Sequence, residues 1–295
     1  MSENVVTTPS RATGASGPAP ARRGLGSRLL RNPRTFVSGA FFVLVFAAVA
    51  FGPALYPIEF RAQVGVPLTQ NGLLGTDDFG RDVFARLLVA TRTSLLVAAG
   101  AVVIALVLGV GLGLLAGFLG GWTSTIIMRG SDILLSFPAV ILAIATVAIL
   151  GPDLVNVVLV IGVIYVPRFT RVVYAQAVSI RSAQYVDAER VNGTPTWSII
   201  ARTVLPNVMS TVIVQASLSL SFAIQVEAGL SFLGLGAQPP LASLGTMIAS
   251  GRDFLEVQPT LLIYPSLILI AIVLAVNVLG DGLRDVLDPR RAFVR

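Results

Sequence analysis

The chain has 295 residues, of which 55% are hydrophobic and only 12% are charged, whereas soluble domains carry about a quarter charged residues. A water-soluble fold cannot bury this much apolar surface, so the composition indicates an integral membrane protein. Cysteine and histidine are both missing, which excludes disulfides, thiolate nucleophiles and the commonest metal ligands and general base.

The positive charge comes from arginine alone, because the sequence contains 21 arginines and no lysine. A P-loop requires a lysine, so this chain cannot supply the standard phosphate site for ATP. If ATP drives the protein, another subunit must bind it. A basic chain could also bind nucleic acid, but cytoplasmic arginines of a membrane protein explain the net charge of +6 better.

The N-terminal stretch 1–34 is rich in Ser, Thr, Pro, Gly and Arg, and we expect a disordered basic cytoplasmic tail. The charge-free run 35–58 follows it. A signal peptide is the competing interpretation, but its apolar core would be about 7–15 residues, shorter than this run. We therefore divide the chain into four regions. They are the tail (1–34), a first transmembrane helix with an extracytoplasmic loop (35–92), a transmembrane domain (93–281) and a cytoplasmic C-terminal tail (282–295).

Long gaps between charges predict six transmembrane helices, since a span needs about 20 apolar residues. The predicted spans cover 36–55, 94–119, the gap between Asp132 and Asp153, 154 to beyond Arg171, 208–225 and 260–279. In the fourth span, Arg168 and Arg171 can snorkel toward the interface. The second span is preceded by a polar outer loop over 56–93, and the fourth and fifth are joined by a long inner loop over 175–206.

Arginine placement predicts the orientation in the membrane. With the N-terminus inside, 16 of the 21 arginines lie on the inner side, as the positive-inside rule requires. With six spans, both termini then lie in the cytoplasm. We expect a multi-pass protein of the plasma or inner membrane.

The inner loop has the pattern of two short helices. Residues from Asp187 to Arg190 favour a helix that Gly193 can cap, and Pro195 suits the first turn of a second helix over 196–204. We expect these helices to lie across the cytoplasmic face. They would form either a docking surface for a partner or an ordinary amphipathic surface helix.

This loop resembles the EAA loop of ABC importer permeases, which reads E-A-A, three residues, G, nine residues, I-x-L-P. Asp187 stands at the position of the family's Glu, and Gly193 has the family spacing. Three positions depart from the pattern: Asp187 is a shorter acid than glutamate, Glu189 replaces the second alanine, and Thr203 replaces the usual apolar residue. The coupling-loop residues implied by the resemblance are Asp187, Ala188, Glu189, Gly193, Leu205 and Pro206.

Three further segments are similar to the C-type permease of dipeptide, oligopeptide and nickel importers. They are Leu74–Asp82 with Arg92–Leu95, Gly229–Gly236, and Gly280–Arg290. The resemblance implies an all-α integral membrane fold of the type I ABC importer permease kind, with a cytoplasmic coupling helix. It also implies a second permease, two ABC ATPases that bind ATP and Mg²⁺, and an extracytoplasmic substrate-binding protein. Peptides would cross between the permeases, with nickel or another small solute as the alternative, and this chain would not be catalytic.

Two groups of residues complete the candidate site. The first group, at the outer end of the fifth span, consists of Glu227, Ser231 and Phe232. These residues either line the pathway or form a gate, or they only pack helices together, with Glu227 as an interfacial carboxylate. The outer loops offer possible contacts to the binding protein: Asp77, Asp78, Arg81, Asp82 and Ser243. A secondary transporter, a channel or an intramembrane enzyme is disfavoured, because the spans contain few charges, no inverted repeat and no His or Cys.

Overall fold

The computed structural model describes residues 33–70 and 72–287, so most of the predicted N-terminal tail and residues 288–295 lie outside it. The regular elements of the described residues are helices. They are α2 (Pro33–Leu55), α3 (Val83–Leu119), α4 (Gly121–Leu135), α5 (Ala139–Leu150), α6 (Leu154–Arg181), α7 (Gln184–Val191), α8 (Thr196–Ile199), the π-helical turn η1 (Ile200–Val204), α9 (Leu205–Phe232), α10 (Leu244–Arg252) and α11 (Thr260–Leu287).

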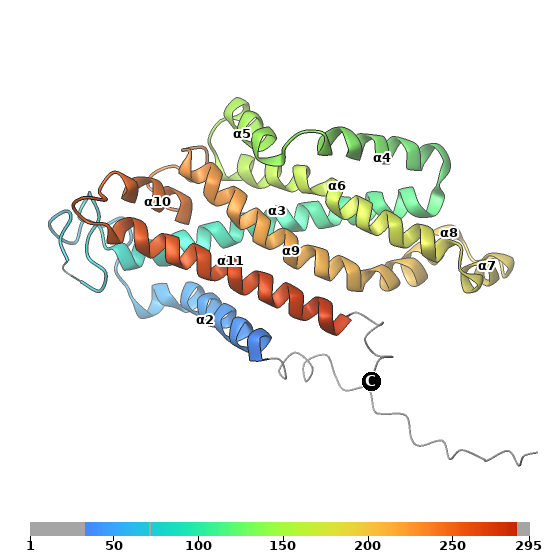
Figure 1. The fold of residues 1–295 in the computed structure, drawn as a ribbon, viewed down its shortest axis with the longest axis horizontal. Coiled ribbons are helices and arrows are strands. Elements are labelled where there is room, and N and C mark those ends of the chain that lie inside the picture. The colour runs from blue at the N-terminus through green and yellow to red at the C-terminus, as the bar shows by residue number, and fades with distance from the viewer. Residues whose placement is uncertain (1–32, 71, 288–295) are drawn as a thin grey trace, which may run out of the picture.

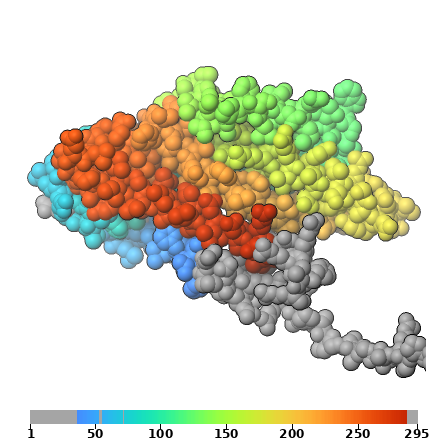
Figure 2. All heavy atoms as spheres, in the orientation of Figure 1, coloured from blue at the N-terminus to red at the C-terminus, as the bar shows by residue number. Residues whose placement is uncertain are grey.

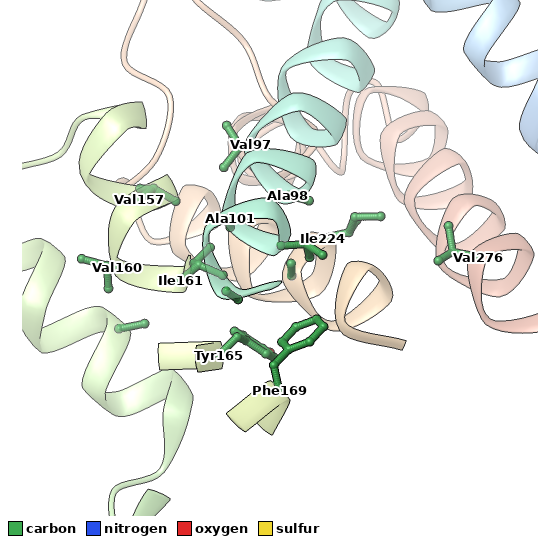
Figure 3. Close-up of a cluster of buried hydrophobic side chains, with 14 of the residues drawn as sticks. Val97, Ala98, Ala101, Val157, Val160, Ile161, Tyr165, Phe169, Ile224 and Val276 are labelled. Carbon is green, nitrogen blue, oxygen red and sulfur yellow. The ribbon is translucent and has the colours of Figure 1, made fainter. Parts of the chain in front are cut away.

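The long helices α3, α6, α9 and α11 run along the long axis of the molecule (Figure 1). The loop that precedes α3 lies at one end together with α10, and α7 and α8 lie at the opposite end. Buried side chains of α3, α6, α9 and α11 form one core, part of which is drawn in Figure 3 around Ile161, Phe169 and Ile224.

Small residues bring α3 and α6 unusually close. A Cβ added at Gly113 would lie 2.7 Å from the Cβ of Val173, and one added at Gly117 would lie 2.6 Å from that of Ala177. Gly109 meets Phe169 one turn away in the same way. Glycines at every fourth position of α3 therefore allow its backbone to pack directly on α6, as small-residue stripes do in membrane helix pairs.

The second predicted span begins earlier than expected. We expected it at 94, but α3 begins at Val83, because the carboxylate of Asp82 accepts a hydrogen bond from the Ala85 N–H at 2.8 Å and caps the helix. Arg86 and Arg92, which the charge-gap criterion assigned to the outer loop, lie on the first turns of this helix.

The third predicted span is a broken helix. We expected one span between Asp132 and Asp153, but α4 and α5 meet there at an angle of 87°. The break is at Ser136–Pro138, where Pro138 restricts the preceding residue to extended backbone and ends the first helix. α4 also begins before Asp132, at Gly121.

The second helix of the inner loop is also different from the expectation. It does not lie apart on the cytoplasmic face, because α8, η1 and α9 form one continuous helix over Thr196–Phe232. Pro206 lies in the first turn of α9 and does not end the loop. The ring of a proline inside a helix clashes with the carbonyl four residues before it. For Pro206 this carbonyl belongs to Arg202, which lies in the wider π-helical turn Ile200–Val204.

Four helices are long and apolar enough to cross a membrane: Val83–Leu119, Leu154–Arg181, Thr196–Phe232 and Thr260–Val286. The bent pair α4–α5 passes the same test as one unit, and α2 contributes a shorter apolar stretch over Phe36–Gly52. The multi-pass helical architecture expected from the sequence is thereby confirmed. In Figure 2, α11 lies across the visible face, with α4 and α5 above it.

Candidate functional site

The inner loop is a folded unit and not a loose connector. α7 is anchored by Val186, which is completely buried, and the chain that follows is anchored by the buried side chains of Ile199 and Val204. The hydroxyl of Thr203 donates a hydrogen bond of 2.8 Å to the carboxylate of Glu189. Two of the positions that depart from the family pattern therefore contact each other and tie α7 to the start of the fifth span.

The tip of this unit presents large apolar side chains to solvent. Trp197 is 65% exposed, Val191 is 87% exposed and Tyr185 is 50% exposed. Asp187 and Ala188 are also exposed, and Asp187 pairs with Arg190 at 3.1 Å on the same helix. The guanidinium of Arg190 lies 5.3 Å from the ring centre of Phe118 at the end of α3. An exposed apolar tip on a rigid base is suited to dock into a groove of a partner.

Gly193 has the backbone conformation that the pattern predicts. Its φ is +74°, in the left-handed region that follows a helix end, and its N–H bonds to the carbonyl of Arg190 at 3.0 Å. An added Cβ would meet no atom within 4 Å, so only the backbone angle disfavours other residues here.

A buried polar cluster lies where α3, α9 and α10 meet. Glu227 is completely buried, and Oε1 of its carboxyl accepts a hydrogen bond of 2.7 Å from Ser231. The hydroxyls of Ser94 and Ser243 lie near the same carboxyl, while Oε2 has no hydrogen bond of ordinary geometry to any described residue. Ser94 also accepts a hydrogen bond of 3.1 Å from the N–H of Leu244. The cluster therefore joins three helices at the end of the molecule where α10 lies (Figure 1).

The short helix α10 is held onto α9 at close range. A Cβ added at Gly245 would collide with the backbone carbonyl of Ala228 and would lie 2.7 Å from the Cβ of Ser231. The side chains of Ser243 and Thr246 form a reciprocal capping box at the start of α10. Ser243 is therefore fully buried, and its side chain offers no surface to a partner in this structure.

The outer loop is built around the carboxylate of Asp77, which is 6% exposed. This group accepts hydrogen bonds from the backbone N–H groups of Phe79 at 2.9 Å and Arg81 at 2.8 Å. It also pairs with the guanidinium groups of Arg81 at 2.7 Å and Arg86 at 3.3 Å. Asp77 and Arg81 thus fold the loop, and they leave the neighbouring side chains as its outward surface.

Asp82 is also internal, because it caps α3 and accepts a hydrogen bond of 3.0 Å from the Tyr56 hydroxyl. Asp78 is only partly covered. Burial raises the pKa of its carboxyl above the usual value, and the charge of Asp77 acts in the same direction, against the lowering effect of Arg81. Phe79, which is 55% exposed, projects beside it. Of the predicted contacts, Asp78 therefore has the most accessible carboxylate.

Two parts of the site were absent from the sequence candidates. Ser94 joins the Glu227 cluster from 133 positions away in the chain, and no local pattern reports such a contact. The exposed tip residues Tyr185, Val191 and Trp197 could have been found, because large apolar residues within a polar loop outside the spans are a signal of docking.

The chain matches known transport proteins over most of its length. Residues 109–293 match the family model described as binding-protein-dependent transport system inner membrane component. The di/tripeptide transport system permease protein DppC of Pseudomonas aeruginosa is 47% identical over 85% of this chain and 86% of its own. The glutathione transport system permease protein GsiD of Pectobacterium atrosepticum is 38% identical over 89% of each chain.

The fold also has a solved counterpart. A chain of the MetNI methionine ABC transporter in inward-facing conformations superposes with a TM-score of 0.55 and covers 68% of this chain and 96% of that one. Its sequence identity is 19%, so this likeness concerns the fold alone. The type I permease architecture expected from the sequence is therefore confirmed.

Proposed function

Because the chain belongs to the family of binding-protein-dependent transport system inner membrane components, and is thus a permease subunit of an ABC importer, we propose that it carries dipeptides and short peptides into the cell. The observation that carries this proposal is the 47% identity to a di/tripeptide permease over 85% of the chain. A second homologous permease would form the other half of the pathway. The same membrane complex would receive its solute from an extracytoplasmic binding protein.

ATP and Mg²⁺ would be bound by two partner ATPases, since this chain has no lysine for a P-loop. Both termini would be cytoplasmic. This orientation places α7 and the tip of the inner loop on the side of the ATPases, and it places α10 and the outer loop on the side of the binding protein.

The inner loop would transmit ATPase motion to the membrane helices. A lever needs a fitted tip and a stiff attachment. Trp197 and Tyr185 supply the tip, and the hydrogen bond between Thr203 and Glu189 supports the attachment. The continuous helix from Thr196 to Phe232 would carry a displacement of the tip directly to the outer end of the fifth span.

The outer loop would contact the binding protein through its exposed members. Asp78 is the most accessible carboxylate among the predicted contacts, and the exposed ring of Phe79 lies next to it in the chain, whereas Asp77, Asp82 and Ser243 are buried. Cross-linkers at Asp78 should capture the binding protein, and a complete lack of capture from the outer loop would contradict this contact.

The test of the proposed function is uptake by the reconstituted transporter with and without this chain. Labelled dipeptides, tripeptides, glutathione and Ni²⁺ are offered in parallel with ATP inside the vesicles. We expect ATP-dependent uptake of dipeptides or tripeptides that requires this chain. Uptake of Ni²⁺ without any peptide uptake would contradict the proposed substrate class and leave the family assignment intact.

The coupling role has its own matched variants. Gly193→Asn keeps a residue that tolerates positive φ, whereas Gly193→Leu does not, so only the second should uncouple uptake from ATP hydrolysis. Asp187→Arg should detach the ATPases, because it reverses a charge on the exposed tip. Thr196→Ala serves as a neighbouring control. Normal uptake by Gly193→Leu and Asp187→Arg at normal expression would mean that the loop is only a connector.

A further inference from the structure

The outer half of α9 carries an exposed stripe that is not uniformly apolar. Phe222, Gln225, Gly229 and Phe232 follow one another at intervals of three or four residues, so they share one face of the helix. Phe222 is 46% exposed and Phe232 is 37% exposed. The amide of Gln225 lies between them, and the space beside Gly229 is empty within 4 Å of an added Cβ. We call these four residues the α9 stripe.

An arginine of a neighbouring helix lies over the inner end of the α9 stripe. The guanidinium of Arg168 is 4.7 Å from the ring centre of Tyr165 and 5.1 Å from that of Phe222. Arg168 is fourteen residues into α6 from Leu154, which places it about 21 Å along this helix from its outer end. It therefore lies well inside the membrane-spanning part of α6.

The charge of Arg168 has no acidic partner among the described residues, although its neighbours are paired. Arg171, one turn further along α6, forms an ion pair with Asp132 of α4. Arg252, which stacks on Phe232 at the other end of the α9 stripe, pairs with Asp253 at 3.2 Å. An arginine within a span that lacks an acidic partner is costly and normally faces a cavity or binds a ligand.

We propose that Arg168 and the α9 stripe form an anion-binding site in the translocation pathway. This site binds the free carboxylate of the transported solute. A guanidinium binds a carboxylate with two parallel hydrogen bonds, and the rings of Tyr165 and Phe222 hold it in place from behind. The Nε2 of Gln225 donates to the carbonyl of Ser221 at 3.1 Å, and no described residue donates to its Oε1. This oxygen can therefore accept a hydrogen bond from the peptide N–H next to the bound carboxylate.

The C-terminal carboxylate of a peptide suits this site better than a permanent acidic side chain of the partner permease does. The inference rests on the proposed peptide import, because every linear peptide has one C-terminal carboxylate whatever its side chains are. One cation therefore serves all members of the substrate class. An acid supplied permanently by the partner permease would instead neutralise Arg168 and would leave the amide of Gln225 without a role.

The first test measures the electrostatics of the α9 stripe without any peptide. The chain has no cysteine, so Gln225→Cys introduces a single thiol into it, and the assembled transporter without this change provides the background rate. An anionic and a cationic methanethiosulfonate reagent are compared. We expect the anionic reagent to react at least about fivefold faster relative to its rate in the Arg168→Gln background, because a unit charge several Å away attracts it.

Two results of this measurement would overturn the inference. If neither reagent modifies the thiol in any state of the transport cycle, the α9 stripe faces lipid or a permanent subunit contact. If the ratio of the two rates is the same with Arg168→Gln, the guanidinium does not act on this part of the pathway.

The second test compares uptake of one peptide with a free C-terminus and as its C-terminal amide. The ratio of variant to wild-type uptake is taken for each peptide, so that selection by the binding protein cancels. Arg168→Gln should lower free-acid uptake about tenfold, equivalent to one charge-assisted contact, and amide uptake less than about twofold. Arg168→Lys should keep part of the preference for the free acid.

Equal losses for both peptides would overturn the inference, and so would loss of the partner permease from purified Arg168→Gln complexes. If the wild-type transporter imports no peptide, the proposed substrate class fails, whereas the thiol measurement still decides the role of Arg168. The thiol measurement also decides the role of Arg168 if the transporter does not import the peptide amide at all.

Discussion

The helices α9 and α11 have the same length of 28 residues, yet their exposed faces differ in chemistry. The exposed face of α11 consists only of aliphatic side chains over its outer half, namely Ile263, Leu267, Ile270 and Leu274. The α9 stripe contains an amide, a glycine and two phenylalanines, each of which stacks with an arginine. From this difference we infer that the exposed face of α11 contacts lipid, whereas the α9 stripe contacts a polar solute, as proposed above.

The buried faces differ in the same way. α9 buries Glu227 with Ser231 at 2.7 Å, and its Ser221 hydroxyl reaches the carbonyl of Val273 on α11 at 3.4 Å. α11 buries apolar residues such as Ile272 and Val276. α9 therefore carries polar groups on its exposed face as well as on its buried face.

The largest expected effect comes from placing a charge on each exposed face at the same depth. Leu267 and Gln225 are each seven residues from the outer end of their helix. Leu267→Arg should cost about 2–3 kcal/mol of insertion free energy, because the guanidinium would enter lipid. Gln225→Arg should leave the amount of assembled transporter near the wild-type level, because its side chain would enter a wet pathway.

This pair is measured as the amount of chain that co-purifies with the partner permease from membranes. Equal losses for the two variants would mean that the two faces have the same surroundings and would break the comparison.

The next largest effect concerns the close contact between α9 and α10. Gly245→Val should destabilise the complex by about 1–3 kcal/mol, because the new side chain collides with the backbone of Ala228. Gly229→Ala, on the exposed face of the same helix, adds a methyl group to open space and should be neutral or slightly stabilising. Thermal unfolding of the purified complex measures both, and an unchanged midpoint for Gly245→Val would mean that α10 packs elsewhere.

A smaller effect is expected for the carboxyl of Glu227. Glu227→Ala should cost about 1–2 kcal/mol, because the Ser231 hydroxyl loses its buried acceptor. Glu227→Gln keeps an acceptor and should cost less. The same unfolding measurement ranks the two variants. If glutamine is as harmful as alanine, the ionised carboxylate, and not hydrogen bonding, holds this junction together.

The smallest effect lies outside both helices, at Asp78. The raised pKa of this carboxyl means that the folded state binds its proton more tightly than the unfolded state does. Its contribution to stability is therefore present below the unfolded pKa and is lost as the pH rises through the folded pKa. Asp78→Asn should raise the unfolding midpoint relative to wild type at about pH 7 but not at about pH 4. An equal difference at both pH values would contradict the assigned cause.

Charge gaps in the sequence located the spans well where charges lie at helix ends. They placed α6 and α11 correctly, and they indicated α2. They failed at α3, because a carboxylate cap at Asp82 lets the helix begin before Arg86 and Arg92. They also failed between Asp132 and Asp153, where every residue is uncharged and only Pro138 signals the break between α4 and α5.

The candidate site was predictable where backbone geometry dictates the residue. Gly193 was identified as a left-handed helix cap and has a φ of +74°. The internal roles of Asp77, Asp82 and Ser243 could not be predicted, because loop composition does not tell whether a polar side chain points outward or folds back to cap a helix. The contact between Glu189 and Thr203 joins positions fourteen residues apart, and it became visible only once α7 and the fifth span were placed together.

The most direct test of the account is the polarity that surrounds the exposed faces of α9 and α11 in the assembled transporter. Spin labels on single cysteines at Gln225 and Phe232 are compared with labels at Leu267 and Leu274, using oxygen and a water-soluble nickel chelate as relaxing agents. We predict that the chelate reaches the α9 labels during the transport cycle and that oxygen dominates at the α11 labels. The same oxygen-dominated accessibility at all four positions would contradict the assignment of α9 to the pathway.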